Sequence, residues 1–267
     1  MYTIGIDIGS TACKAVALKD GKEIAGTSVI ETGTGTSGPA RVYEAVFTSS
    51  GIDPKDAART VVTGYGRLTF EKADSQISEL SCHAQGVHFL CPGARTIIDI
   101  GGQDAKALKL GPNGSLSSFV MNDKCAAGTG RFLDVMAKIL EVSVGELAGL
   151  SEKSTERVSI SNICTVFAES EVISQLAAGK SRKDIAAGIH MSVANRVAGL
   201  ARRVGIVPDV VITGGVAQNM GVVRAMSEIL NMPIIPAPMP QLTGALGAAL
   251  LAYGEAIKKS ERGIHFE

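Results

Sequence analysis

The sequence has 267 residues, of which 45% are hydrophobic and 19% are charged, so the chain is long enough and apolar enough to bury a substantial core. Its 26 basic residues equal its 26 acidic residues, and no cluster of Lys and Arg forms the basic stripe that binding to a phosphate backbone requires. The composition therefore excludes a typical nucleic-acid-binding protein and predicts one or two closely packed globular domains.

The first residues lack the features of an export signal. Asp7 and a glycine-rich turn follow the start almost at once, where a signal peptide would continue its apolar region. No run approaches the roughly 18 apolar residues of a membrane span. We therefore expect a cytoplasmic protein that does not enter a membrane.

Five cysteines are distributed widely along the chain. An odd number, wide spacing and no export signal argue against a disulfide framework, so we expect reduced thiols or metal ligands. The five are Cys13, Cys82, Cys91, Cys125 and Cys164.

The first predicted element is a β-hairpin. Residues 3–9 read as a buried strand that ends in a tight turn, and residues 14–18 read as the returning strand. The same pattern recurs in residues 96–102 and 106–110. In this repeat Asp7 corresponds to Asp99, Gly9 to Gly101 and Lys14 to Lys106.

This internal repeat predicts an α/β protein with a duplicated domain, in which two similar sheets place their turns toward one cleft. We expect the first domain over residues 1–92 and the second over residues 93–267. The C-terminal helix is expected to pack back on the first domain.

A third strand, residues 210–215, ends in two glycines and leads toward a helix over about residues 222–230. Residues 33–39 read as a loop and residues 233–240, rich in proline, as an extended segment. Apolar residues at helical spacing predict the other helices. These lie at about residues 78–90, 130–140, 169–178, 185–204 and 244–259.

Each of the three glycine-rich turns follows an apolar strand, and two of them carry an Asp just before the turn. Such turns suit a nucleoside triphosphate, because glycine lets backbone N–H groups approach phosphate oxygens, hydroxyl groups add donors, and carboxylates hold Mg²⁺, often through water. Any one of these turns, taken alone, is more often an ordinary hairpin.

Together, Asp-Ile-Gly-Ser-Thr, Asp-Ile-Gly-Gly-Gln-Asp and Thr-Gly-Gly-Val-Ala-Gln-Asn resemble the phosphate-1, phosphate-2 and adenosine motifs of the actin, sugar-kinase and Hsp70 ATPase superfamily. The resemblance implies two similar domains around a nucleotide cleft. It implies phosphate contacts from two turns, one with Gly9, Ser10, Thr11, Ala12, Cys13 and Lys14 and the other with Gly101, Gly102 and Gln103. It places Asp7 and Asp99 near Mg²⁺. The residues that it places along the adenosine are Gly214, Gly215, Gln218 and Gln241. For Gln241, a plain surface-loop residue is the close alternative.

The group that activates the attacking nucleophile is not fixed by these motifs. A kinase needs a carboxylate base for a substrate hydroxyl, whereas an ATPase only orients water. Gln103 and Asp104, which follow the second glycine pair, are the candidates to orient water.

Cys125 and Cys164 both precede predicted helices. Free N–H groups and the helix dipole at a helix N-terminus stabilise a thiolate or an anionic cluster. No C-x-x-C spacing is present, so on local grounds a small buried apolar residue is the commoner explanation for either cysteine.

Longer stretches carry a more specific resemblance. Residues 122–134, Asn-Asp-Lys-Cys-Ala-Ala-Gly-Thr-Gly-Arg-Phe-Leu-Asp, and residues 164–174, Cys-Thr-Val-Phe-Ala-Glu-Ser-Glu-Val-Ile-Ser, resemble the activators (component A) of (R)-2-hydroxyacyl-CoA dehydratases, within the BadF/BadG/BcrA/BcrD-type ATPases. Thr-Gly-Tyr-Gly-Arg at residues 63–67 and Ser-Glu-Leu-Ser-Cys-His at residues 78–83 extend the resemblance.

The resemblance implies a homodimer that holds one [4Fe-4S] cluster between its subunits, each supplying two cysteines, here Cys125 and Cys164. It assigns the cluster to the segments 122–134 and 161–174. It also implies ATP-driven transfer of one low-potential electron to a dehydratase of two subunits, with ferredoxin or flavodoxin as the electron donor. The thiols of Cys13, Cys82 and Cys91 are then structural.

Three alternatives stay open at this point. One is the ATPase component of a benzoyl-CoA-type reductase, which shares the fold and the cluster but has heteromeric partners. The second is a cluster-free small-molecule kinase of the same superfamily, and the third is a nucleotide-switched binding protein of the Hsp70 kind. The sequence does not reveal which 2-hydroxyacyl-CoA a partner would dehydrate.

Overall fold

The computed structural model describes residues 1–122 and 124–261. The chain forms two compact units, and each is described here by itself. Of the described residues, the first unit comprises 1–92, 112–116 and 241–261, and the second comprises 93–111, 117–122 and 124–240. In the described part of the chain, no helix is long and apolar enough to span a membrane.

The first unit contains a five-stranded sheet in the order β3-β2-β1-β4-β5. Its strands are β1 (Tyr2–Ile8), β2 (Cys13–Lys19), β3 (Glu23–Ile30), β4 (Ala57–Thr63) and β5 (Ser75–Gln76), and its helices are α1 (Gly38–Ser50), α2 (Glu79–Leu90) and α8 (Thr243–Glu261), with short 3₁₀ helices η1 (Pro54–Asp56) and η2 (Arg67–Thr69).

The second unit is built on a sheet in the order β8-β7-β6-β9-β10. Its strands are β6 (Thr96–Ile100), β7 (Ala105–Leu110), β8 (Leu116–Asn122), β9 (Val210–Thr213) and β10 (Ile234–Pro236), and its helices are α3 (Gly130–Ile139), α4 (Val144–Glu152), α5 (Thr165–Ala177), α6 (Arg182–Val204), η3 (Gly215–Gln218) and α7 (Met220–Leu230).

The two sheets repeat one topology. In each, the first strand lies at the centre, pairs antiparallel with the second strand and pairs parallel with the fourth. The register is also repeated, because Asp7 pairs with Lys14 across the first hairpin and Asp99 pairs with Lys106 across the second. The duplicated α/β fold predicted from the sequence is therefore confirmed.

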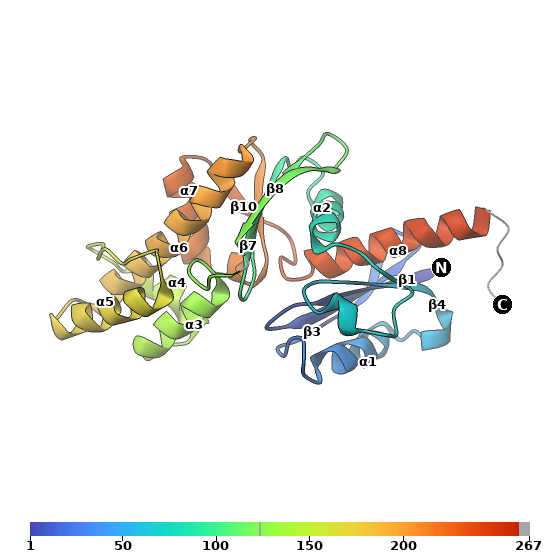
Figure 1. Ribbon diagram of the computed structural model, residues 1–267, viewed down its shortest axis with the longest axis horizontal. Helices are drawn as coiled ribbons and strands as arrows, with labels where there is room; N and C mark the ends of the chain where they lie inside the picture. The colour runs from blue at the N-terminus through green and yellow to red at the C-terminus, as the bar shows by residue number, and fades with distance from the viewer. Residues whose placement is uncertain (123, 262–267) are drawn as a thin grey trace. The chain divides into compact units, whose positions relative to one another are not determined.

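Close backbone packing joins α8 to the rest of the first unit. This helix runs beside β1, β4 and α2 (Figure 1). A Cβ atom at Gly247 of α8 would lie 1.7 Å from the carbonyl oxygen of Cys82 in α2, and one at Gly5 of β1 would lie 2.0 Å from the carbonyl oxygen of Ala245. The Thr3 hydroxyl donates to the carbonyl oxygen of Ala249 at 3.0 Å. Glycines at these positions let the helix approach the sheet and α2 closely.

The longest of the described helices, α6, has 23 residues and forms the centre of the second unit. It packs against β7, α4 and α7 within one core that includes residues of α3, α4, α5, α6 and α7 (Figure 1). Gly205, in a left-handed conformation, ends the helix.

The helix predicted over residues 169–178 begins earlier than expected. In the structure α5 starts at Thr165 and Cys164 is its N-cap residue. The apolar spacing that guided the prediction fails at this end because Val166 and Phe167 are exposed rather than buried.

A cavity of about 310 Å³ lies in the second unit beside α6. Its lining includes His190 and Met191 of α6, Arg224 and Glu228 of α7, Glu152 of α4, and Arg157. His190 is only 2% exposed, and neither ring nitrogen has a hydrogen-bond partner among the described residues. Burial, with a smaller contribution from the positive charge of Arg224, lowers the pKa of His190 to about 4.

The depressed pKa of His190 predicts a pH-dependent stability. An unfolded histidine binds its proton below about pH 6.5, whereas folded His190 does so only below about pH 4. Because the unfolded state binds more protons between these two values, the free energy of unfolding falls as the pH is lowered from about 6.5 to about 4, and above pH 6.5 this loss is absent. Between about pH 7.5 and pH 5 this residue should remove about 2 kcal/mol from the free energy of unfolding.

Replacing the residue tests this expectation. His190→Leu removes the titrating ring and should flatten the dependence of stability on pH, as measured by denaturant unfolding across this range. Equal pH dependence in the variant and the parent protein would contradict it.

Candidate functional site

The first glycine-rich turn joins β1 to β2. The Gly9 N–H donates to the carbonyl oxygen of Ala12 at 3.0 Å, which closes the turn. Just inside it, the Lys14 ammonium lies 3.3 Å from Asp7 Oδ2, and both side chains are largely buried. The ion pair therefore fixes the strand ends, while Thr11 stands exposed at the tip of the turn and Ser10 is half-buried.

Two glycines leave room for the Asp7 carboxylate. A Cβ atom at Gly64 would lie 2.4 Å from Asp7 Oδ1, and one at Gly244 would lie 3.2 Å from Asp7 Oδ2. The neighbouring Cys13 side chain is fully buried, and burial raises its pKa to about 11. Cys13 therefore offers its backbone to the turn, and its thiol packs in the core.

A loop not assigned to the site from the sequence lies against this turn. The Thr34 N–H donates to the carbonyl oxygen of Gly9 at 2.9 Å, and a Cβ atom at Gly33 would lie 2.1 Å from the carbonyl oxygen of Ser10. In the sequence, the glycines of residues 33–38 were the signal that could have indicated this contact, because glycine permits such close backbone approach.

The second turn, between β6 and β7, repeats this geometry with deeper burial. The Gly101 N–H donates to the carbonyl oxygen of Asp104 at 2.9 Å. The Lys106 ammonium lies 3.1 Å from Asp99 Oδ2 and also pairs with Asp104, and the side chains of Lys106 and Asp99 are each 3% exposed. Because the Asp104 carboxylate pairs with Lys106 while Gln103 is exposed, Gln103 is the freer of the two candidates to orient water.

The third turn lies against the second in the same unit. Gly214 has a φ of +86°, and a Cβ atom on it would lie 2.3 Å from the carbonyl oxygen of Ile100 and 2.8 Å from Asp99 Oδ1. Only glycine fits this position without strain. The structure thus brings Asp99, Gly101 and Gly214 together, with Gly215 and Gln218 exposed in η3.

Gln241, the residue predicted to contact the adenine base, is half-buried and belongs to the first unit, two residues before α8.

The second turn is hydrogen-bonded to the start of α3. The Gly130 N–H donates to the carbonyl oxygen of Gly101 at 2.9 Å, and the Arg131 N–H donates to that of Gly102 at 2.8 Å. Just before these residues, the Thr129 hydroxyl donates to the carbonyl oxygen of Ala126 at 2.6 Å. The segment that follows Cys125 is therefore joined directly to the second turn, the one that carries the predicted phosphate-2 motif, and the sequence did not predict this link.

The segments around Cys125 and Cys164 meet in the second unit. Cys125 Sγ lies 4.0 Å from the carbonyl oxygen of Ile163, the residue before Cys164. Both cysteines are half-buried free thiols, and Cys164 caps the N-terminus of α5. Asp123, part of the predicted segment 122–134, lies outside the described residues.

The other thiols have environments that disfavour ligation. Cys82 is fully buried, which raises its pKa to about 12, and burial also raises the pKa of Cys91. A metal ligand must be a thiolate, so these positions suit a structural role. Among the described residues, no group of three or more His, Cys, Asp or Glu side chains is placed to hold a metal ion.

Large apolar side chains are exposed next to Cys164. Three of them lie on α5 itself, and the fourth, Ile163, immediately precedes its N-cap residue. The exposed residues are Ile163, Val166, Phe167 and Ile173.

The fold defines the class of protein. A ROK family glucokinase from Streptomyces griseus, solved in complex with glucose and AMPPNP, superposes with a TM-score of 0.57 at 16% identity, over 95% of this chain and 100% of that one. The likeness is one of fold alone: the chain shares the duplicated α/β fold of this sugar kinase. Within that class, the sequence matches the BadF/BadG/BcrA/BcrD ATPase family over residues 4–252, and the chain belongs to this family.

Similar proteins of this family include named activators. The activator of lactoyl-CoA dehydratase from Anaerotignum propionicum is 60% identical, over 97% of this chain and 100% of its own length. The (R)-2-hydroxyglutaryl-CoA dehydratase activating ATPase from Acidaminococcus fermentans is 60% identical, over 97% and 99%.

A solved structure agrees with these relatives. The activator of the 2-hydroxyisocaproyl-CoA dehydratase from Clostridium difficile with bound ADPNP has a TM-score of 0.95 and 58% identity, over 100% of this chain and 99% of that one. The resemblance to dehydratase activators is thus confirmed.

A component of the benzoyl-CoA reductase from Thauera aromatica is 31% identical, over 93% of this chain and 92% of its own length.

The exposed position of Gln103 predicts a selective catalytic defect. Gln103→Ala removes the side chain proposed to orient water but leaves the turn and the Lys106 ion pairs in place, so ATP turnover should fall by about 10- to 100-fold while nucleotide affinity changes little. Steady-state hydrolysis and equilibrium binding of ADP measure the two quantities. Unchanged hydrolysis would remove Gln103 from the mechanism.

Proposed function

We propose that this protein is an ATP-dependent activator that transfers one low-potential electron from a [4Fe-4S] cluster, held between two copies of the chain, to an (R)-2-hydroxyacyl-CoA dehydratase. The observation that carries the proposal is the arrangement in the second unit. There the phosphate-2 turn is hydrogen-bonded to the start of α3, and the segment before α3 brings Cys125 to within 4.0 Å of the Ile163 carbonyl, next to Cys164.

The glycine turns would bind the nucleotide. Backbone N–H groups at the Gly9 and Gly101 turns would contact phosphate oxygens, and Lys14 would add a positive charge. Asp7 and Asp99 would hold Mg²⁺ through water, because each carboxylate already pairs with a lysine. Gly215, Gln218 and Gln241 would line the adenosine. The ADPNP bound to the related Clostridium difficile activator supports the presence of a nucleotide site in this chain.

Cys125 and Cys164 fit a [4Fe-4S] cluster in their chemistry. Both are free and partly accessible, and Cys164 lies at the N-terminus of α5, where unpaired N–H groups favour an anionic ligand. A cubane cluster takes four cysteines, so two from each chain require a second copy related by a twofold axis. When bound, the cluster would supply one electron at low potential.

The apolar face beside Cys164 suits that second copy. Ile163, Val166 and Phe167 are each more than 60% exposed, and they adjoin a ligand that needs partners from another chain. Burial of such side chains stabilises a dimer. We therefore assign this face to the homodimer contact, in continuity with the shared cluster.

The chain's own hydrogen bonds would provide the coupling between nucleotide and cluster. A change in the phosphate-2 turn during hydrolysis would move Gly101 and Gly102, whose carbonyl oxygens accept from Gly130 and Arg131. These residues follow Cys125 by one short turn, so the movement reaches a ligand directly. Ferredoxin or flavodoxin would return the electron to the activator, and a dehydratase of two subunits would receive it.

The relatives favour the dehydratase over the other candidate partner. Identity is 60% to activators of lactoyl-CoA and (R)-2-hydroxyglutaryl-CoA dehydratases but 31% to the benzoyl-CoA reductase component. Co-purification with a dehydratase of two subunits supports the proposal, whereas isolation within a heteromeric reductase contradicts it.

Iron content tests the cluster assignment. Protein purified without oxygen should be coloured and contain about four irons per dimer, because two cysteines per chain complete one cubane cluster. Cys125→Ser and Cys164→Ser should each abolish iron binding, while Cys91→Ser serves as a matched control that retains it. Colourless, iron-free protein that phosphorylates a small molecule would establish the kinase alternative instead.

A further inference from the structure

The segment between α4 and α5 lies along one face of α6. This segment, residues 153–163, is called the connector here. It contacts α6 at Asp184, Gly188 and Ser192, which are spaced four residues apart and therefore share one face of the helix. The connector ends immediately before Cys164.

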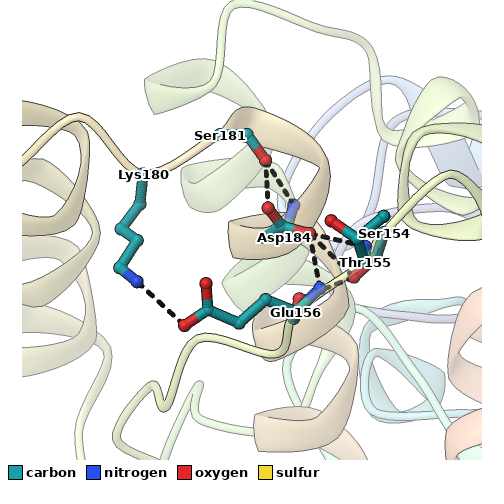
Figure 2. Close-up of polar contacts among 6 residues, drawn as sticks. All are labelled: Ser154, Thr155, Glu156, Lys180, Ser181 and Asp184. Carbon is teal, nitrogen blue, oxygen red and sulfur yellow. Dashed lines mark hydrogen bonds and ion pairs between the residues drawn. The ribbon is translucent and has the colours of Figure 1, made fainter.

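At its first end the connector is held by the Asp184 carboxylate (Figure 2). Asp184 Oδ1 accepts from the Thr155 N–H at 2.8 Å, the Glu156 N–H at 3.0 Å and the Ser154 hydroxyl at 3.1 Å, and Oδ2 accepts from the Ser181 hydroxyl. These hydrogen bonds, from Ser181 first and then from the connector N–H groups, hold the pKa of Asp184 well below its usual range. The carboxylate is thus charged and saturated with donors from the connector and the helix start.

In its middle the connector touches the backbone of α6. A Cβ atom at Gly188 would lie 2.0 Å from the carbonyl oxygen of Val158. Val158 and Ile160 are both buried in the core of the second unit. No residue other than glycine at position 188 leaves the connector where it is.

At its far end the connector is held by a hydroxyl group. The Ser192 hydroxyl donates to the carbonyl oxygen of Ser161 at 2.8 Å, and the Ser161 N–H donates to Glu171 Oε2 of α5 at 2.6 Å. Ser161 precedes Cys164 by three residues, which together span at most about 10 Å. The position of Ser161 therefore limits the position of Cys164.

We infer that Asp184, Gly188 and Ser192 are positioning residues, through which α6 sets the place of Cys164 relative to Cys125 by holding the connector along its length. That this arrangement serves a cluster rests on the proposed function. That α6 sets the position of the Cys164 thiol does not depend on the proposed function. The sharpest perturbation is Gly188→Ala, because the added methyl group must displace the Val158 carbonyl.

The helix supplies a matched control for each substitution. Gly199 also lies on α6, and a Cβ atom there meets nothing within 4 Å, so Gly199→Ala makes the same chemical change without touching the connector. Ser192→Ala removes only the hydroxyl that holds Ser161, and Asn195→Ala truncates an exposed polar residue one turn away. Ser192→Ala keeps the inference testable if Gly188→Ala does not fold.

The first measurement uses the iron-free protein with Cys91→Ser. Iodoacetamide alkylates the remaining accessible thiols, and mass spectrometry gives the rate at Cys164 relative to that at Cys125. Gly188→Ala and Ser192→Ala should change this ratio several-fold, and Gly199→Ala and Asn195→Ala should leave it unchanged. If the ratio is unchanged in Gly188→Ala and Ser192→Ala, the inference is overturned. It is also overturned if the ratio changes equally in all four variants.

The second measurement uses the cluster-loaded protein. Gly188→Ala and Ser192→Ala should shift the reduction potential of the cluster while the two controls match the parent protein, because a displaced ligand alters the hydrogen bonding and solvent exposure of the sulfur atoms. An unshifted potential in both connector variants counts against the inference. Failure of the parent protein to bind iron contradicts the proposed function, whereas the alkylation ratio still decides the role of α6.

Discussion

A buried ion pair between an aspartate and a lysine, formed across each of the two hairpins, is the interaction on which the site depends. Burying two charges is costly, and the pair offsets that cost only when its geometry is held. Here the strand register holds it, since Asp7 faces Lys14 and Asp99 faces Lys106. The glycine turn that follows each aspartate is consequently closed by the same hydrogen bond, from the first glycine to the residue three positions later. Duplication of one hairpin thus produces two turns of equivalent geometry, which we propose to bind phosphate.

In both copies the carbonyl oxygen of the first glycine of the turn accepts a backbone hydrogen bond, from Thr34 at Gly9 and from Gly130 at Gly101, but only in the second copy does the donor segment follow a cysteine closely. Its turn accepts hydrogen bonds from Gly130 and Arg131 at the start of α3, which follows Cys125 closely. Cys164 is approached by a different route, through the connector that lies along α6 and ends at this cysteine. One proposed ligand is therefore joined to the nucleotide turn, and the other to the longest helix of the core. In the proposed function, such an arrangement would let one sulfur respond to the nucleotide while the other stays with the scaffold.

The sequence revealed the duplicated fold because Asp, Gly and Lys recur at matching positions in strands that otherwise differ. It did not reveal α1 or α4, although Pro39 near the start of α1 and the Ser143–Glu146 capping box of α4 were signals of helix starts. Only part of the candidate site could be predicted from the sequence, because the link between Gly101 and Gly130 is a tertiary hydrogen bond. Cys125 and Cys164 lack a short metal-binding spacing, so their segments became neighbours only through the packing of α3, α5 and α6.

The central claim is that nucleotide and cluster are coupled through the second unit. The most direct measurement is the electron paramagnetic resonance spectrum of the anaerobically reduced dimer, recorded without nucleotide and with Mg²⁺ and ADPNP. The account predicts the signal of a reduced [4Fe-4S] cluster whose shape changes when the nucleotide binds, and loses that change when Gly101 is replaced by alanine. A cluster signal identical in both conditions, or no cluster signal in the fully reduced protein, would contradict it.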